Sequence, residues 1–130
     1  MNDSIQLITA PISLGELIDK ITILKIKANR LEGVALKNVI NELNCLEKTL
    51  SSLQLDLDVT LIERLSQVNY CLWQIEDDIR EQERQKKFGD VFIGLARSVY
   101  QKNDQRAALK KEINIAYGSA LVEEKSYRDY

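Results

Sequence analysis

Apolar residues near the start of the chain recur at steps of three and four, which places them on one face of an α-helix. Ser13 precedes this series and Glu16 follows three residues later. Such a pair forms a capping box, which satisfies exposed backbone N–H groups of a first helical turn. Gly33 marks the expected stop. The sequence therefore predicts a first helix between Ser13 and Gly33 whose inner face carries Leu14, Leu17, Ile21, Leu24, Ala28 and Leu31.

Two further series have the same spacing, and the first of them alternates threes and fours throughout, like a coiled-coil seam. Near its end, leucines alternate with polar residues at a period of two, which suits an extended segment, so we end the second helix near Ser52. Thr60 and Glu63 offer a second capping box, so we begin the third helix near Thr60. The two seams are Leu36, Val39, Leu43, Leu46, Leu50, Leu53 and Leu57, and then Leu61, Leu65, Val68, Leu72, Ile75 and Ile79.

Helix breakers are scarce in this part of the chain. No proline and no glycine lies between Gly33 and Gly89. In a helix interior, glycine costs about 1 kcal/mol and proline about 3 kcal/mol, so long helices are favoured there. The third helix is expected to continue past Ile79 and overhang the core until Phe88 and Gly89 interrupt it.

The last third of the chain predicts a shorter helical pair. Asp90 can cap a fourth helix, and Asn103 with Asp104 suggests the cap of a fifth one that ends at Gly118. One kinked helix from Asp90 to Tyr117 is the alternative. The inner face of the fourth helix carries Val91, Phe92, Leu95, Val99 and Tyr100.

The two ends of the chain look less helical. Residues 1–12 form an extended N-terminal segment with the sole proline, Pro11, and residues 119–130 form a C-terminal tail. Pairing of the two ends as a two-stranded ribbon and a disordered tail are both open. At 130 residues the chain fits a single domain.

Together these elements predict an all-α fold, an antiparallel helical bundle of about five helices with coiled-coil-like seams. Regular seams on three helices leave more apolar surface than one short bundle covers. We therefore expect a homodimer that buries part of it.

Composition and charge exclude several classes of protein. Eighteen basic residues nearly balance twenty acidic ones, so the chain lacks the basic footprint of a nucleic-acid-binding protein. Neither a signal peptide nor a membrane span is indicated. Cys45 and Cys71 lie far apart without a metal-binding spacing, which favours reduced thiols in a cytoplasmic protein.

The chain contains no histidine, which removes histidine bases, histidine-activated nucleophiles and histidine-containing zinc sites. It also lacks a glycine-rich phosphate loop. The sequence therefore predicts no cofactor.

One polar group follows Trp73 on the third helix. Glu76 and Arg80 are four residues apart, which favours an ordinary intrahelical ion pair. Asp77 and Glu81 could instead help hold a divalent metal, but a second acidic motif is missing, so we predict no metal site.

A second polar group lies at the junction expected near residue 103. In the simplest interpretation, Asn103 and Asp104 cap a helix and Arg97 binds exposed carbonyls. The alternative is an anion site, where Arg97, Arg106 and Lys110 converge on a helix N-terminus at residues 104–107. The candidate ligand-binding residues are Trp73, Glu76, Arg80, Arg97, Asn103, Asp104, Arg106 and Lys110.

Charged residues also decorate the first helix. Lys20, Lys25, Lys27 and Arg30 do not form one stripe, and Asp19 lies among them. This pattern is typical of a solvated helix face.

Four stretches resemble a small bacterial family catalogued only as a domain of unknown function: Pro11 to Leu24, Val68 to Arg80, Phe88 to Asn114, and Gly118 to Tyr127. The most specific residues are Leu72, Trp73, Ile75, Glu76, Asp77 and Arg80, then Ala96, Arg97, Tyr100, Asn103, Asp104, Arg106 and Ala107, then Glu123, Glu124, Lys125 and Tyr127. The resemblance implies no activity. It implies that the polar junction and the acidic tail belong to one pattern with the core.

The sequence thus favours a cytoplasmic helical interaction or scaffold protein without catalysis, acting as a homodimer or with another protein. The competing hypothesis is a protein, or an enzyme, that binds an anionic phosphate or carboxylate metabolite in an arginine-rich cleft.

Overall fold

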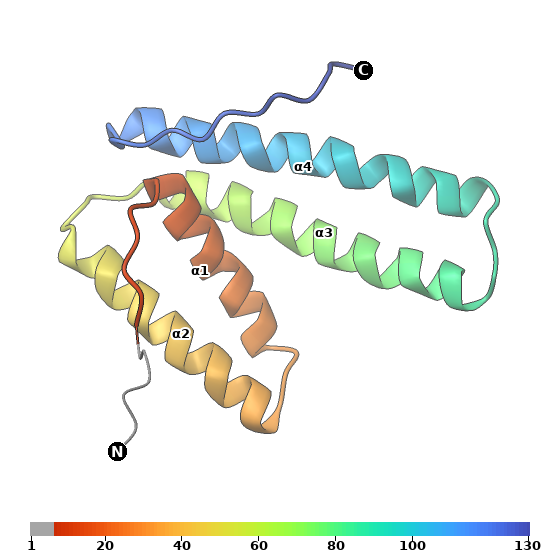
Figure 1. The fold of residues 1–130 in the computed structure, drawn as a ribbon, viewed down its shortest axis with the longest axis horizontal. Coiled ribbons are helices and arrows are strands. Elements are labelled where there is room, and N and C mark those ends of the chain that lie inside the picture. Colours follow the sequence, from red (N-terminus) through yellow and green to blue (C-terminus); the bar gives the residue numbers. More distant parts are fainter. Residues whose placement is uncertain (1–6) are drawn as a thin grey trace.

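The computed structural model describes residues 7–130 and places four α-helices in them, with no strand in that part of the chain. The helices are α1 (Leu14–Ala28), α2 (Gly33–Ser52), α3 (Val59–Arg84) and α4 (Asp90–Ala116) (Figure 1). The all-α prediction is confirmed. The predicted N-terminal segment lies partly outside the described residues, and its described part, residues 7–12, has no regular secondary structure.

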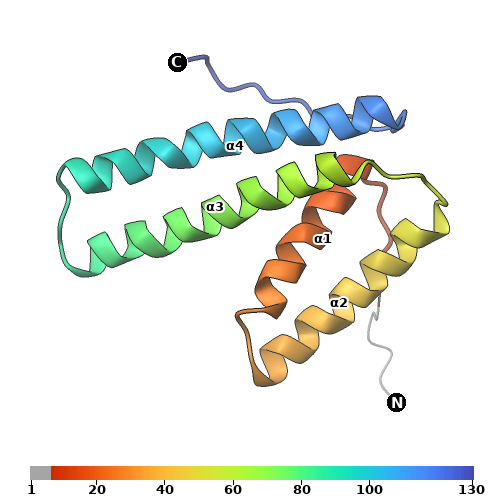
Figure 2. The same cartoon turned by 180° about the vertical axis from the view of Figure 1, so that it is seen from behind.

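The helices form two hairpins that cross. α3 and α4 lie side by side as a long pair, and α1 runs steeply across one end of this pair (Figures 1 and 2). Within the described residues, α1 packs against all three other helices, whereas α2 packs against α1 alone. α1 is therefore the central element of the fold.

The start of α1 is held by its own cap and by the end of α4. The Ser13 hydroxyl accepts a hydrogen bond from the backbone N–H of Glu16 at 3.1 Å, which is one half of the predicted capping box. The Glu16 carboxylate accepts from Lys110 instead of reaching back to Ser13. The next two free N–H groups, of Leu14 and Gly15, donate instead to the side chains of Ser119 (3.2 Å) and Asn114 (2.6 Å). The N–H groups of Leu14, Gly15 and Glu16 are therefore all bound by side chains of the protein itself.

Several helix boundaries differ from the predicted ones. α1 ends at Ala28, and Gly33, with φ +62°, begins α2 instead of closing α1. α2 ends at Ser52, as predicted. The side chain of Asp58, not that of Thr60, caps α3 by accepting from the N–H of Thr60 at 2.9 Å.

The prediction of a fifth helix is wrong, because α4 is one continuous helix from Asp90 to Ala116. Asn103 and Asp104 lie within it with their side chains exposed, so nothing there removes the backbone from its helical hydrogen bonds. The predicted cap at Asp90 is also wrong, since Gly89 is the N-cap residue and no side chain caps this end. Gly118, with φ +63°, ends the helix as predicted.

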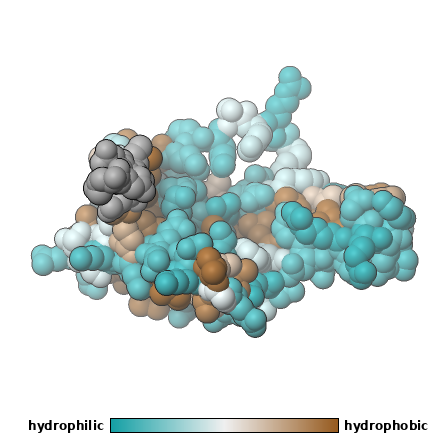
Figure 3. All heavy atoms as spheres, turned by 60° about the horizontal axis from the view of Figure 1, so that its bottom comes forward, coloured by the Kyte–Doolittle hydropathy of each residue, from teal (hydrophilic) through white to brown (hydrophobic). Residues whose placement is uncertain are grey.

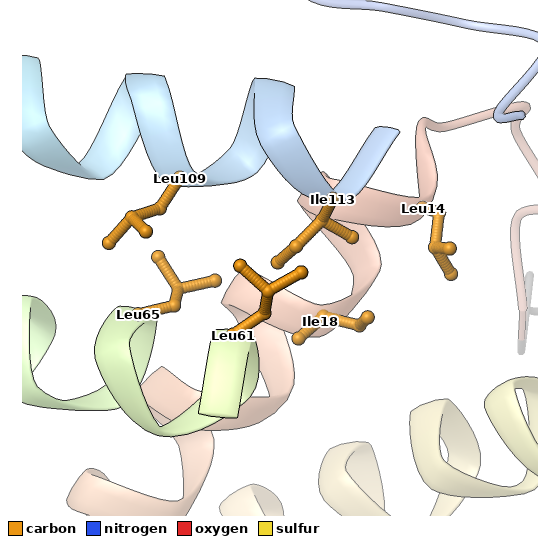
Figure 4. Packing of buried hydrophobic residues seen from close by; sticks show 6 residues of the cluster. All are labelled: Leu14, Ile18, Leu61, Leu65, Leu109 and Ile113. Atoms are coloured by element: carbon orange, nitrogen blue, oxygen red, sulfur yellow. The ribbon is translucent and has the colours of Figure 1, made fainter. Parts of the chain in front are cut away.

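Two hydrophobic clusters lie on adjoining faces of α1. One joins α1 to α3 and α4, and Figure 4 shows its side chains pointing toward one another. The other joins α1 to α2. The first consists of Leu14, Ile18, Leu61, Leu65, Leu109 and Ile113, and the second of Leu17, Ile21, Leu24, Val39 and Leu43.

The far part of the α3–α4 hairpin, residues 75–103, extends past α1 and is called the arm below (Figure 1). Within residues 70–108, all of which the structure describes, no residue is buried. The apolar seam residues of the arm, such as Ile79 and Leu95, are half-buried, and Ile93 is 52% exposed. The predicted overhang is therefore present, and both α3 and α4 take part in it.

The C-terminal tail, residues 119–130, runs back beside α4 without regular secondary structure (Figures 1 and 2). Both carboxylate oxygens of Glu124 accept from Lys111 at 3.0 Å. The ring of Tyr130 meets that of Tyr100 edge-on, with 5.0 Å between centroids. A ribbon between the ends was one of two open alternatives, and residues 7–130 contain no strand that would form it.

The surface of the molecule is mixed. On the face shown in Figure 3, hydrophobic residues form patches separated by hydrophilic ones. None of the four described helices combines the length and apolarity needed to cross a membrane.

Candidate functional site

A carboxylate lies fully buried where α1 crosses α3 and α4. Asp19 of α1 has an exposed fraction of 0%. Its Oδ1 accepts from Arg106 Nε at 3.0 Å, and its Oδ2 accepts from Arg106 Nη2. This is the two-pronged geometry that fits a guanidinium to a carboxylate. The Asp19–Arg106 pair therefore ties α1 to α4 from inside the molecule.

Two polar neighbours complete the environment of Asp19. Asn69 of α3, only 2% exposed, donates from Nδ2 to Asp19 Oδ1 and to Thr22 Oγ1, both at 2.8 Å. Thr22 in turn donates to the backbone carbonyl of Asp19 at 2.7 Å. All three helices at the crossing thus contribute to one hydrogen-bonded network.

The network keeps Asp19 ionised. Burial by itself would raise the pKa of this carboxyl, but the hydrogen bonds from Arg106 and Asn69 and the charges of Arg106 and Lys110 outweigh it, so the pKa is lowered. The same hydrogen bond raises the pKa of Arg106, so both partners are held in their charged forms.

Lys110 extends the network toward the tail. Its side chain is 8% exposed, and its Nζ lies 2.5 Å from a carboxylate oxygen of Glu16, 3.7 Å from Asp19 and 3.5 Å from Glu123. Gly15 permits this close approach of α1 to α4, because a Cβ there would lie 2.5 Å from the carbonyl oxygen of Lys110.

Five of the eight predicted ligand-binding residues meet around one hollow of about 390 Å³, called the Trp73 hollow here. It lies between α1, α3 and α4. These five are Trp73, Glu76, Arg80, Asn103 and Arg106, and Ile23, Asn69, Leu72 and Asp77 complete the lining.

A second hollow of about 490 Å³ lies between α4 and the tail. Asn103, Asp104, Arg106 and Lys110 line it, together with tail residues that include Tyr127 and Arg128. Arg97 lies exposed on the arm and lines neither hollow. The structure therefore brings seven of the predicted residues together around two adjoining hollows and leaves Arg97 apart.

The predicted anion site at a helix N-terminus is wrong, because α4 is continuous and the N–H groups of residues 104–107 lie inside it. Two of the three cations predicted to converge there are also paired. Arg106 is bound by Asp19 and Lys110 by Glu16. The lining of these hollows is thus close to charge balance.

The polar group on α3 forms two ion pairs. Arg80 and Glu76 make the predicted intrahelical pair at 3.3 Å. Asp77 binds Arg30 at 2.6 Å, and the Arg30 guanidinium lies 5.2 Å from the centroid of the Trp73 ring. Among residues 7–130, no group of three or more acidic or thiol side chains is arranged to hold a metal ion.

Sequence reasoning missed the most buried part of the site. The sequence pattern places Asp19 on a solvated face and gives Glu16 only a capping role, and it does not single out Asn69 or Thr22. A signal for Asp19 was present, because Gly15, Asp19, Thr22 and Ile26 follow one another at steps of four, three and four, and all four are buried. Small and polar residues at this spacing mark a second inward face of α1.

Comparison with known protein families gives a match over nearly the whole chain. Residues 8–129 match the family model described as "Family of unknown function (DUF6165)". Neither the curated proteins nor the solved structures contain a match to this chain.

Proposed function

The chain belongs to this family of unknown function, and we propose that it is a helical interaction protein without catalysis that forms a homodimer through its arm. The observation that carries the proposal is the absence of any buried residue in residues 70–108. Two helices that cover each other on one side only are marginally stable, because most helical stability comes from a packed apolar face. A second copy would supply the missing cover.

Charge supports a second copy as the occupant of this surface. Residues 75–84, on α3, include five acidic and two basic residues, whereas residues 85–103 include one acidic and four basic residues. An antiparallel pairing of two arms sets the acidic α3 side of one copy against the basic side of the other. The arm is therefore complementary to itself.

The candidate site supports a function without catalysis. The two cations of the network, the half-buried Arg106 and the buried Lys110, are each held by carboxylates. The chain offers no histidine as a base. We place the protein in the cytoplasm, in keeping with Cys45 and Cys71, which are both free thiols.

The test is the mass of the protein in solution, measured by size-exclusion chromatography with light scattering at micromolar concentration. The wild type is expected at twice 14.9 kDa. Ile93→Glu on the arm should give the monomer mass. The matched control is Ile115→Glu, since Ile115 is also an exposed isoleucine of α4 (67%) but lies outside the arm, and it should leave the dimer intact. A wild type that stays monomeric overturns the proposal.

A second candidate function, binding of a small molecule that carries a carboxylate or phosphate, is favoured by the Trp73 hollow. Its volume of about 390 Å³ lies in the range of small-molecule sites, and residues of three helices line it. Its test is a panel of small anions in a thermal-shift assay. Binding should raise the melting temperature of the wild type and not that of Arg80→Gln, and no shift with any anion would count against it.

A further inference from the structure

We infer that the ligand of the Trp73 hollow is a zwitterion, with a carboxylate and an ammonium group on one small apolar framework, as in a free amino acid. This inference rests on the second candidate function, binding of a small molecule in this hollow. It specifies which charged groups that ligand carries, whereas the sequence alone indicated only an anion.

The first step is the fixed position of Arg106. Its Nε and Nη2 are bound to the fully buried Asp19, and Asp19 is itself held by Asn69. The remaining nitrogen, Nη1, makes no hydrogen bond with any residue in the described part of the chain, and the residue lines the hollow. Arg106 borders both this hollow and the one between α4 and the tail, and as part of this inference we assign its free donor to the Trp73 hollow. Such a donor, already held in place, can bind a carboxylate without reorganisation.

The second step is the exchangeable ion pair that α3 contributes to the lining of the hollow. Arg80 and Glu76 lie 3.3 Å apart, and their side chains are 79% and 48% exposed. Exposed pairs of this kind contribute little, so a ligand can replace either partner. An ammonium group that binds Glu76 releases Arg80, which can then join Arg106 on the carboxylate of the same ligand.

The third step is charge balance. Around the hollow, the guanidiniums of Arg30, Arg80 and Arg106 are matched by the carboxylates of Asp77, Glu76 and Asp19. A simple anion that recruits Arg80 leaves Glu76 without a partner and adds a negative charge to a neutral lining. A simple cation leaves Arg80 unpaired. A zwitterion leaves every charge with a partner.

The apolar part of the ligand has its own surface. Trp73, Leu72 and Ile23 line the hollow, and Arg30 covers the Trp73 ring. The two asparagines in the lining, Asn69 and Asn103, add polar groups that can orient a small ligand. A framework of a few carbons therefore fits better than a bare ion.

The test uses the fluorescence of Trp73, which is the sole tryptophan of the chain and so reports on this hollow alone. The full-length protein, at one fixed concentration, is titrated with leucine, with 4-methylpentanoate, which lacks the ammonium group, and with 3-methylbutylamine, which lacks the carboxylate. We expect a saturable change with leucine and at least tenfold weaker binding of the two analogues.

Variants assign the two ends of the ligand. Glu76→Gln should remove the preference for leucine over 4-methylpentanoate, and Arg80→Gln should weaken leucine binding. Arg84→Gln, an arginine of the same helix that does not line the hollow, is the control and should bind leucine like the wild type.

Two results contradict the inference in different ways. Binding of 4-methylpentanoate as tight as that of leucine overturns the zwitterion and leaves the small-molecule site standing. No saturable change with any of the three probes overturns the zwitterion, and the small-molecule site is overturned with it if the panel of small anions also gives no thermal shift.

Discussion

The two ends of the α3–α4 hairpin consist of the same two helices and are stabilised differently. At the crossing with α1, Leu65 and Ile113 are fully buried, and a carboxylate, an amide and a guanidinium form a closed polar network. In the arm, contacts from outside the hairpin include the ion pair of Arg30 with Asp77 and the edge-on contact of Tyr130 with Tyr100. The apolar residues of the two helices stay partly exposed there. The apolar residues of α3 and α4 are spaced alike at both ends of the hairpin. The core at the crossing therefore depends on α1, which packs against the pair only there.

The difference also separates two kinds of charged residue. Asp19 has an exposed fraction of 0% and binds partners on α3 and α4, whereas Glu81 in the arm binds Arg84 of its own helix. Removing one partner of a buried pair leaves an uncompensated charge, and an exposed pair carries no such penalty. Substitutions at the two ends should therefore differ sharply in effect.

The largest effect is expected for Asp19→Ala. The substitution leaves the Arg106 guanidinium without its carboxylate and the Asn69 amide without an acceptor, and it should reduce the free energy of unfolding by about 3–5 kcal/mol. Urea denaturation followed by circular dichroism measures it. A loss below 1 kcal/mol would show that the network is not what holds α1 to α4.

Acid should reduce the stability of the protein less than Asp19→Ala does, because a protonated Asp19 keeps its volume and part of its hydrogen bonding. The folded pKa of Asp19 lies below the unfolded value of 3.8. Its contribution to stability is therefore complete above pH 3.8 and is lost as the pH falls through the folded pKa. Thermal unfolding from pH 6 to pH 2 should show this loss below about pH 4 in the wild type. In Asp19→Asn that component should be missing, and an identical pH profile for the two proteins would contradict the assignment.

Two glycine-to-alanine substitutions should change the stability by smaller amounts. The change should be a decrease at the crossing and an increase in the arm. At Gly15 the new methyl group would press on the backbone of Lys110, so stability should fall by about 1–3 kcal/mol. At Gly94, inside α4 in the arm, nothing lies within 4 Å, and alanine should stabilise the helix by about 0.5–1 kcal/mol. Thermal denaturation of both variants checks the pair. Equal effects would mean that the two ends are packed alike.

The smallest effect is expected for Arg84→Ala. The Arg84–Glu81 pair lies on the surface of the arm, and both partners belong to one helix. The melting temperature should stay within experimental error of the wild type. A clear decrease would reveal a contact that a single copy of the chain does not make.

Local spacing predicted much of the fold, because a helix is defined by neighbours three and four residues apart. It located α1, the end of α2 and the start of α3. It failed at Asn103 and Asp104, which have the residue types of a cap but lie exposed on a continuous helix. Residue type alone does not distinguish a cap from a polar residue on a solvated helix face.

The candidate site was less predictable, because its central contacts join distant parts of the sequence. Arg106 was recognised as a site residue, but its partner Asp19 lies 87 positions away on α1. Nothing local distinguishes Asp19 from the solvated charges beside it, such as Lys20, except its place on the face of Gly15 and Thr22. Only the crossing of α1 with α4 turns these residues into one network.

The most direct test of the central claim, that the arm lacks a core of its own and is covered by a second copy, is hydrogen exchange at two protein concentrations. At a concentration that favours the dimer, amides of residues 75–99 should be protected, and on dilution to the monomer they should exchange much faster. Amides of residues 61–69 and 109–113 should stay protected at both concentrations. Equal and strong protection of the arm at every concentration, with a monomeric mass throughout, would contradict the account.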